Sequence, residues 1–360
     1  MENETHWQKK HFIHKGIGVE KINYSISFSP PMNNNKETIN RSNGTPDTYI
    51  FSPQEIILKD DAFHGSKGTH FSEWWYFDAA LNNGYSIQLS VLIASALKLS
   101  LLFFRFDLYK DGHLMSHKRK IHLLKDVQIS KEKPFIKLGD KTIVQGSFNE
   151  KTGNLIYDIS VAIEDISAEL QFIGTTKGWK GKHEANDWWA VVLPRASVNG
   201  TITLQKETIT VHGNGYHDHN WNTKIFALKN IGWYWGKIYS DRTAITWANI
   251  LRTKVKVHPL LVINTIHNGY INVLPKDFCF NATDISEENG KMIPHVFTLD
   301  VQTTAVTLHV IMKTVDIHHV KIFQLMDYWR YHVKCTGSIT VDSNTESIDD
   351  LYIAEFLKFP

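Results

Sequence analysis

The stretch "HGNGYHDHNWNTKIFALKNIGWYWGKIYS", residues 212–240, decides the fold because it places bulky, titratable and small residues in strand-like order. It holds three His, three Trp and three Tyr, with glycines between them. Successive strand residues point to opposite faces. One face is then formed by Gly213, Gly215, His217, His219 and Trp221. Tyr216 and Asp218 point the other way.

The second half of the stretch repeats the pattern. If it is a strand, one side carries Trp233, Trp235, Lys237, Tyr239 and Asp241. Tyr234, Gly236 and Ile238 lie opposite. Strands that are bulky on both faces are typical of barrels whose outside packs on another layer. We expect the stretch to line a cavity, with glycines making room for large neighbours.

Two further segments are as rich in aromatic residues. FSEWWYFDAAL (71–81) alternates Glu73, Trp75 and Phe77 with Trp74, Tyr76 and Asp78. EANDWWAVVLP (184–194) places Asp187 beside two tryptophans. The chain has 11 Trp, and many of them gather in these segments, which favours an aromatic-lined cavity over isolated core residues.

The rest of the chain predicts an all-β protein. Short β-branched and aromatic runs recur between turn residues, with hairpin tips at Asp111-Gly112, Lys206-Glu207 and Asp241-Arg242. Only residues 286–292 and 346–357 are arguable helices. The apolar stretch 87–106 is close to a membrane span in length, but its flanks predict two buried strands joined near residues 96–98. Contact of this stretch with a membrane surface is a further alternative.

Length and composition indicate two domains and a polar arm. A chain of 360 residues is long for one core. Residues 1–47 are polar and poor in apolar groups, so we expect a disordered arm. We expect folding proper to begin near Tyr49.

Several classes of function are disfavoured. Lys+Arg 39 against Asp+Glu 37, without a basic stripe, argues against nucleic acid as a partner. Cys279 and Cys335 lie far apart, which indicates neither a disulfide scaffold nor a zinc knuckle. The N-terminal residues lack an apolar secretion signal, so we expect a cytoplasmic protein. Peripheral contact with a membrane surface is compatible with that location. Neither a G-x-S-x-G elbow nor a Gly-rich nucleotide loop is present.

The aromatic segments carry a resemblance to a known family. Glu73-Trp74-Trp75-Tyr76, the run 215–221 (GYHDHNW), the run 232–236 (GWYWG) and the closing run 351–355 (LYIAE) resemble the carotenoid 1,2-hydratase and AttH-like family of lipocalin-like proteins, which includes hydroxyneurosporene synthase. The resemblance covers roughly residues 49–360 and implies two consecutive calycin-type β-barrels. We place the N-terminal lipocalin-like domain at 48–226 and the C-terminal one at 227–360. The plan is also similar to that of fungal pericyclases. Members differ in reaction, so the fold does not settle the chemistry.

The resemblance also implies a set of site residues. In hydratases of this family a His and a Trp two positions on, then a Tyr and an Asp two positions apart, are proposed to act. His219, Trp221, Tyr239 and Asp241 match that spacing, with Asp241 as the proton donor. We expect the ligand to contact Glu73, Trp75, Tyr76, His217, Trp233 and Trp235. No cofactor or metal is implied.

Each assignment has a structural alternative. Asp241-Arg242 is also an ordinary hairpin tip. His217 and His219 fit barrel histidines that bond to neighbouring carbonyls, Trp221 fits a core residue, and Glu73 fits a buried network. The pair His217 and His219 is a partial metal motif, but neither HExxH nor a 2-His-1-carboxylate spacing accompanies it.

The sequence therefore predicts acid-base chemistry, hydration or cyclisation, on an alkene of an isoprenoid-like or polyketide-like molecule. A buried carboxylic acid can donate the proton, and indole faces can stabilise the cation. The alternative is a non-catalytic carrier of a hydrophobic small molecule. Asp241 distinguishes the two, because an acid must be dry whereas a carrier tolerates it at an exposed turn.

Overall fold

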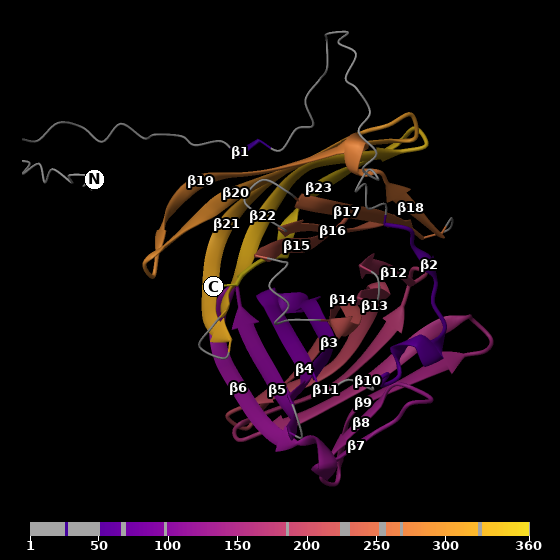
Figure 1. Cartoon of the computed structure of the whole chain (residues 1–360), viewed down its shortest axis with the longest axis vertical. Coiled ribbons are helices and arrows are strands. Elements are labelled where there is room, and N and C mark those ends of the chain that lie inside the picture. The colour runs from indigo at the N-terminus through magenta and orange to yellow at the C-terminus, as the bar shows by residue number, and fades with distance from the viewer. Residues whose placement is uncertain are drawn as a thin grey trace, which may run out of the picture.

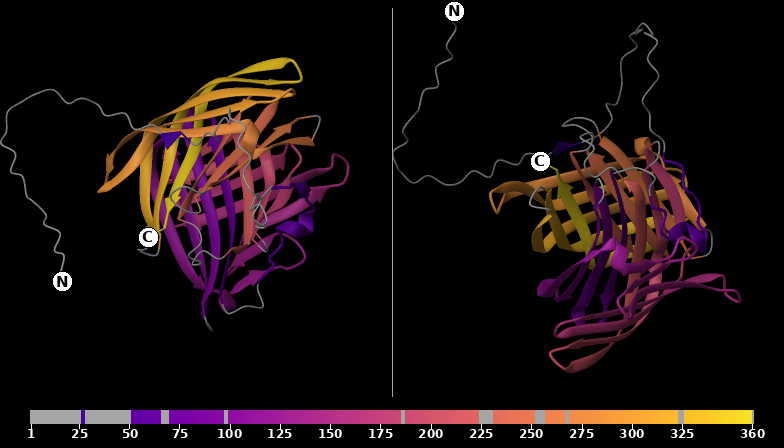
Figure 2. Two further views of the ribbon diagram at one scale, coloured as in Figure 1. Left: turned by 45° about the horizontal axis from the view of Figure 1, so that its top comes forward. Right: turned by 60° about the horizontal axis from the view of Figure 1, so that its bottom comes forward.

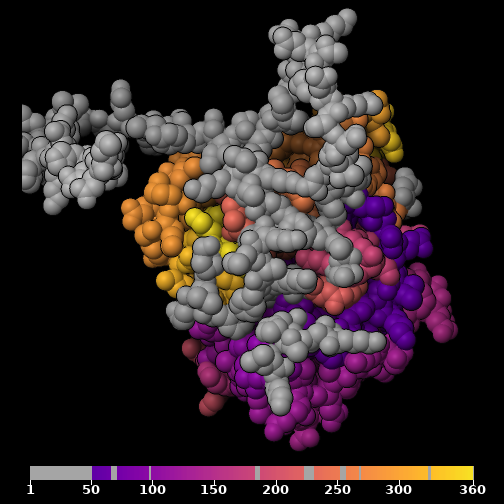
Figure 3. Space-filling view, in the orientation of Figure 1, coloured from indigo at the N-terminus to yellow at the C-terminus, as the bar shows by residue number. Residues whose placement is uncertain are grey.

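Two curled antiparallel sheets make up the molecule, as predicted from the sequence. The computed structural model describes residues 26–27, 51–65, 70–96, 99–184, 187–223, 231–251, 257–266, 269–322 and 326–359. The first sheet lies below and the second above in Figure 1, and the described residues of the two are in contact in the space-filling view (Figure 3). Figure 2 shows the same two curved layers from two further directions.

The first sheet has 13 strands in the order β6-β5-β4-β3-β14-β13-β11-β10-β9-β8-β7, with β12 paired to β13 and β2 paired to β12. Its strands are β2 (Gln54–Glu55), β3 (His70–Leu81), β4 (Tyr85–Ala96), β5 (Leu99–Lys110), β6 (His113–Leu123), β7 (Val127–Ile129), β8 (Phe135–Leu138), β9 (Lys141–Asn149), β10 (Asn154–Ile163), β11 (Ile166–Gly174), β12 (Trp179–Glu184), β13 (Asp187–Leu204) and β14 (Glu207–Thr223).

The second sheet has ten strands in the order β1-β19-β20-β21-β22-β23-β15-β16-β17-β18. They are β1 (Ile26–Ser27), β15 (Gly232–Tyr239), β16 (Thr243–Leu251), β17 (Val257–Thr265), β18 (Gly269–Val273), β19 (Phe278–Glu288), β20 (Lys291–Gln302), β21 (Val306–Ile322), β22 (Met326–Val341) and β23 (Asn344–Lys358). Within the described ranges, four short 3-10 helices join strands: η1 (Leu58–Asp61), η2 (Asn82–Gly84), η3 (Leu124–Asp126) and η4 (Pro275–Asp277).

The chain passes from one sheet to the other between Thr223 and Gly232. The predicted domain boundary at 226/227 lies outside the described residues, so it stays a prediction. The predicted arm, residues 1–47, is also outside them except for β1, which pairs with β19.

The apolar stretch 87–106 forms two paired strands, as predicted. Ala96 at the end of β4 pairs with Leu99 at the start of β5. Leu89, Val91 and Ile93 point into the core of the first sheet. Among the described residues, no helix has both the length and the apolar character that a membrane span requires.

The two segments that we considered as arguable helices are not helical. Residues 286–292 form the end of β19, a turn at Asn289-Gly290 with positive φ at both residues, and the start of β20. Residues 346–357 lie in β23, which is bonded to β22 on one side and β15 on the other. Hairpin pairing of β19 with β20, and pairing of β23 with β22 and β15, override the local helical pattern.

The predicted hairpin tips are close to the observed ones. Asp111-Gly112 joins β5 to β6, and Asp241-Arg242 lies between β15 and β16. The third tip is Gln205-Lys206, one residue earlier than predicted, since both residues have positive φ and Glu207 begins β14. Cys279 and Cys335 form no disulfide.

Each curled sheet encloses its own core, and a third cluster joins them. Phe77, Phe104 and Phe172 pack inside the first sheet. Trp247, Phe280 and Trp329 belong to the core of the second. The third cluster combines residues of both sheets: Phe51, Tyr76, Trp179, Trp189, Val191, Tyr216, Trp235, Ala248, Leu260, Val262 and Ile353. The two barrel-like units are therefore joined by a largely aromatic interface.

Glycines make room for large side chains, as expected. A Cβ on Gly236 would lie 2.7 Å from the Trp247 ring, to which Gly236 is paired across β15 and β16. A Cβ on Gly215 would lie 2.4 Å from Phe172. Neither contact fits a close-packed interior.

Gly236→Ala should destabilise the protein by about 1–3 kcal/mol, because the added methyl overlaps the Trp247 indole. Trp247→Phe removes the ring atoms nearest to Gly236. In the double variant the Gly236→Ala substitution should therefore lower the free energy of unfolding by less than it does in the wild-type background, as measured by urea unfolding. Additive effects of the two substitutions would contradict this packing account.

Candidate functional site

The strand pair β3–β14 presents two chemically different faces. Trp75 pairs with His219 and Phe77 with His217, and these side chains point into the first sheet's interior. Tyr76 pairs with Asp218 and Trp74 with Asn220, on the face toward the second sheet. The predicted alternation is confirmed, and it separates the site residues into two groups.

The inner face holds a buried network around Asp61, which η1 supplies. The Asp61 carboxylate lies 2.9 Å from His217 Nε2 and 3.1 Å from His219 Nδ1, and accepts a 2.7 Å hydrogen bond from the Tyr157 hydroxyl. The Trp75 indole donates to the Asp61 carbonyl at 3.0 Å. Asp61 is fully buried, and despite that burial the two histidines hold its pKa well below the usual range.

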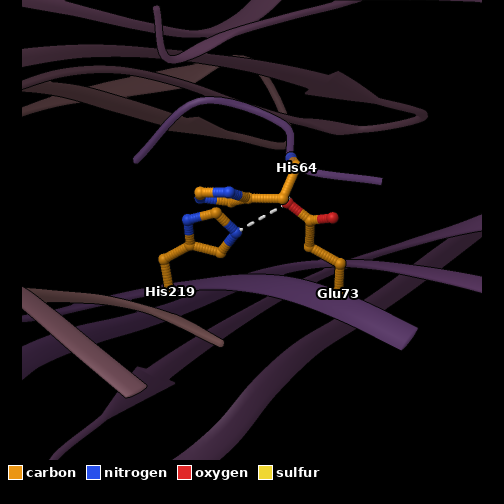
Figure 4. A group of neighbouring side chains, drawn as sticks. All are labelled: His64, Glu73 and His219. Atoms are coloured by element: carbon orange, nitrogen blue, oxygen red, sulfur yellow. Dashed lines mark hydrogen bonds and ion pairs between the residues drawn. The ribbon is translucent and has the colours of Figure 1, made fainter. Parts of the chain in front are cut away.

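Glu73 belongs to the same network, which is one of the alternatives considered for it. Its Oε1 lies 3.0 Å from His219 Nε2 and accepts a 2.8 Å bond from the His64 backbone N–H (Figure 4). Its Oε2 accepts a bond from the Gly65 backbone N–H at 2.9 Å. His64 stacks on Trp221 with ring centroids 4.1 Å apart.

The potential metal-ligand atoms of His64, Glu73 and His219 lie within 4.8 Å of one another. Among the described residues, these three therefore form a group that could hold a metal ion. Their present contacts are those of a hydrogen-bond network. His219 lies between Asp61 and Glu73; burial lowers the pKa of its imidazole, but the hydrogen bonds to both carboxylates outweigh burial and raise it to about 9. A doubly protonated ring balances the carboxylates but has no lone pair for a metal.

The outer face borders a cavity of about 120 Å³ between the two sheets. Its lining comes from seven strands: Trp74, Tyr76, Asp187, Trp189, Asp218, Asn220, Trp233, Trp235, Ala248, Ile250, Leu260 and Glu355. The Trp74 and Trp233 rings are stacked across it, with centroids 6.5 Å apart and planes 8° from parallel. We call this space the junction cavity.

A buried ionic network forms one side of the junction cavity. The Tyr76 hydroxyl lies 2.9 Å from Asp78 Oδ2 and 3.0 Å from Glu355 Oε1, and Arg330 Nη1 donates to both Tyr76 and Glu355. Lys237 pairs with Asp78. In each of these two ion pairs the cation balances the charge of its carboxylate, as buried charges require.

Glu355 is held through one of its oxygens. The hydroxyl of Tyr328 donates to Oε1 at 2.6 Å, in addition to Tyr76 and Arg330. Among the described residues Oε2 has no hydrogen-bond partner, and the side chain lines the junction cavity. Burial raises the pKa of Glu355, while Arg330 and the two tyrosines act in the opposite direction.

Asp218 lines the same cavity without a cationic partner. Its Oδ2 accepts hydrogen bonds from Trp189 Nε1 at 3.0 Å and from the Tyr216 hydroxyl at 2.9 Å. Within the described ranges no lysine or arginine forms an ion pair with it, in contrast to Asp78 and Glu355. Burial raises its pKa to about 7, although the two hydrogen bonds favour the ionised form.

The structure brings only part of the predicted site together. Tyr76, Trp233 and Trp235 line the junction cavity. Tyr239 is buried beside it, 3.4 Å from Lys237 Nζ and bonded to the Gly215 carbonyl at 3.1 Å. Glu73, Trp75, His217, His219 and Trp221 lie on the inner face instead, apart from the junction cavity lining.

The burial expected for Asp241 is wrong. Asp241 is exposed at the turn between β15 and β16, where its carbonyl accepts a hydrogen bond from Arg195 at 3.1 Å. The strand ends at Tyr239, so the alternation that predicted an inward side chain does not extend to residue 241. An exposed turn does not supply the desolvation that raises the pKa of an acid.

Sequence reasoning missed Asp218 and Glu355 as site residues. The alternation placed Asp218 opposite the two histidines, but nothing in the sequence showed which face borders the junction. A signal was present in Asp187 and the flanking tryptophans, since Asp187 and Trp189 line the same cavity. Glu355 and Arg330 come from β23 and β22, whose pairing a single sequence does not reveal.

Two barrel-like sheets with a cavity between them define a lipocalin-like double-barrel protein. The AttH-like family model matches residues 53–346, so the chain belongs to this family. Hydroxyneurosporene dehydrogenase of Chlorobaculum tepidum is 23% identical over 180 residues, which are 47% of this chain and 44% of that protein. The match thus spans less than half of that relative's length.

Solved structures share the fold. An AttH-type protein of Nitrosomonas europaea aligns with a TM-score of 0.63 at 15% identity, over 84% of this chain and 96% of the other. CghA with Sch210972 gives 0.58 at 8% identity, over 81% and 88%. Kievitone hydratase from Nectria haematococca gives 0.56 at 10% identity, over 85% and 93%.

Asp218→Asn should stabilise the protein above neutral pH. The folded pKa of Asp218 exceeds the unfolded value of 3.8, so wild type loses stability as pH rises from about 4 through about 7. The amide avoids burial of an unpaired charge. We expect a gain of about 1–3 kcal/mol in unfolding free energy at pH 8 and little gain at pH 4. Equal effects at both pH values in urea titrations would contradict the raised pKa.

Proposed function

We propose that the junction cavity is the active site of a hydratase or cyclase that acts on an alkene of a hydrophobic substrate, with Asp218 as the proton donor. The observation that carries the proposal is a carboxyl group held among tryptophans without a cationic partner in the described part of the chain, whose pKa of about 7 leaves a fraction of it protonated at neutral pH. Asp218 takes the role that the sequence assigned to Asp241. The names of two structural neighbours, a hydratase and a protein solved with Sch210972, support this reaction class.

The first step is protonation of the alkene. The Asp218 carboxylic acid gives its proton to one alkene carbon, the π electrons form the new C–H bond, and positive charge develops on the other carbon. Trp74, Trp233 and Trp235 present indole rings to the same cavity. Each ring face can stabilise a cation by about 0.5–2 kcal/mol in a dry site.

The second step needs a nucleophile and a base. A water molecule attacks the cationic carbon in a hydration, while a group of the substrate itself does so in a cyclisation. Glu355 is the base in this proposal, because its Oε2 has no partner among the described residues and Arg330 stabilises its ionised form. It takes the proton that the nucleophile loses, and exchange with solvent restores both carboxyl groups. Burial raises the pKa of both carboxyl groups, but Glu355 has Arg330 beside it, so Glu355 is assigned the role of the base.

The size of the junction cavity suggests how the substrate binds. A volume of about 120 Å³ is below the usual range for sites that enclose a whole drug-sized ligand, about 300–1,000 Å³. A chain of isoprenoid or polyketide length would therefore place only its reacting end among the tryptophans. The remainder would lie outside the cavity.

Asp218→Asn should lower turnover by about 10²–10⁴-fold, the usual contribution of a general acid, while ligand affinity changes little. The amide keeps the shape and can still accept from Trp189 and Tyr216. The assay follows gain of labelled water, or cyclisation, with geranylgeraniol and a prenylated phenol as probes. Asp241→Asn is the matched control and should retain full activity. An active Asp218→Asn or an inactive Asp241→Asn would contradict the assignment.

The same assay distinguishes an enzyme from a carrier. A non-catalytic carrier would bind the probes without converting them, and neither substitution would alter binding. The exposed position of Asp241 is the observation that supports the carrier as the alternative function, because a carrier tolerates an acidic residue at that turn.

Turnover should also fall as pH rises through about 7, since the protonated form of Asp218 is lost there. At low pH it should fall again as Glu355 becomes protonated. A rate profile measured under saturating probe should therefore be bell-shaped. A rate that increases steadily between pH 6 and pH 9 would rule out Asp218 as the acid.

A further inference from the structure

The face of the first sheet that borders the junction cavity continues outward as an apolar row. Trp74 on β3 pairs with Leu92, Leu92 with Phe103 on β5, and Phe103 with Ile121 on β6. Directly paired residues share a face of the sheet. Figure 1 shows the four strands side by side, with β6 outermost. The row therefore runs from the cavity wall to the edge strand.

A second row beside it is also apolar near the edge. Ala94 pairs with Leu101, and Leu101 with Leu123. Ile121 is 63% exposed, Leu99 53% and Leu123 39%, so the apolar surface becomes open to solvent toward β6. Scattered exposed apolar residues are normal, whereas adjacent ones mark an interaction surface.

Basic residues accompany this apolar edge. Residues 113–125 (HLMSHKRKIHLLK) include four Lys or Arg and no acidic residue. Lys118 forms ion pairs with Glu164 and Asp165, which neutralise it. Arg119, Lys120 and Lys125 are exposed, and Asp126 is the exposed acidic neighbour. The balance at the edge is positive.

We propose that this edge docks on the surface of an anionic lipid bilayer. The docking face consists of Leu99, Ile121 and Leu123 with Arg119 and Lys125. Apolar side chains that enter the headgroup boundary, flanked by basic ones that attract anionic lipids, are the two signals that reversible membrane binding requires.

A membrane fits this face better than a protein partner because of its continuity with the junction cavity. If the proposed function holds, a hydrophobic substrate dissolves in the bilayer, and the row Ile121, Phe103, Leu92 and Trp74 joins that source to the site. The docking itself does not depend on any catalytic step.

The experiment is co-sedimentation of the full chain with phosphatidylcholine vesicles, with and without about one third phosphatidylglycerol. We expect binding to the anionic vesicles, weakened by high salt. Ile121→Ser/Leu123→Ser and Arg119→Ala/Lys125→Ala should each weaken binding by about tenfold or more. Met292→Ser is the matched control, since Met292 is 62% exposed on β20 of the other sheet, and it should bind as wild type does.

Two further measurements keep the outcome unambiguous. Circular dichroism and urea unfolding check that the variants fold, which surface substitutions should leave unchanged. Asp218→Asn should bind vesicles like wild type, so loss of activity and loss of docking are separable. Absence of binding to anionic vesicles, or equal loss with Met292→Ser, would overturn the proposal. A concentration-dependent dimer that Ile121→Ser/Leu123→Ser abolishes would also overturn it, because the face would then join two copies of the chain.

Discussion

The alternation of side chains along β3 and β14 is the constraint on which the rest of the structure depends. Every second residue points into the first barrel-like sheet, and the residues between point toward the second. His219 and Asp218 are neighbours in sequence, yet their side chains lie in different environments. A shift of register by one residue would exchange the two sets and destroy both.

Charge balance distinguishes the two faces. On the inner face the imidazoles of His217 and His219 compensate Asp61 and Glu73, backbone N–H groups also donate to Glu73, and the network joins η1 to the sheet. On the outer face Lys237 compensates Asp78 and Arg330 compensates Glu355. Asp218 has no such partner among the described residues. A buried carboxyl group with a pKa of about 7 is partly protonated at neutral pH, and on this ground we propose that the outer face is reactive and the inner face structural.

The sequence predicted the fold well and the site in part. Strand periodicity and hairpin tips sufficed for an all-β protein, the family resemblance implied the two barrel-like sheets, and the parity of Trp75, Phe77, His217 and His219 was correct. The same parity could not show that the inner face is filled, because His217 and Asp218 are equally plausible cavity residues until the second sheet is in place. Asp61 lies in a short 3-10 helix without a distinctive motif. Asp241 was misplaced because the strand ends two residues earlier, where the chain turns.

The most direct test of this account is the titration of the Asp218 carboxyl group itself. Infrared difference spectra of protein with isotope-labelled aspartate, compared with Asp218→Asn, isolate the carbonyl band of this protonated side chain. The account predicts a band that disappears with a midpoint near pH 7 and is absent from the variant. A midpoint near pH 4, the ordinary value for a solvated aspartate, would contradict it.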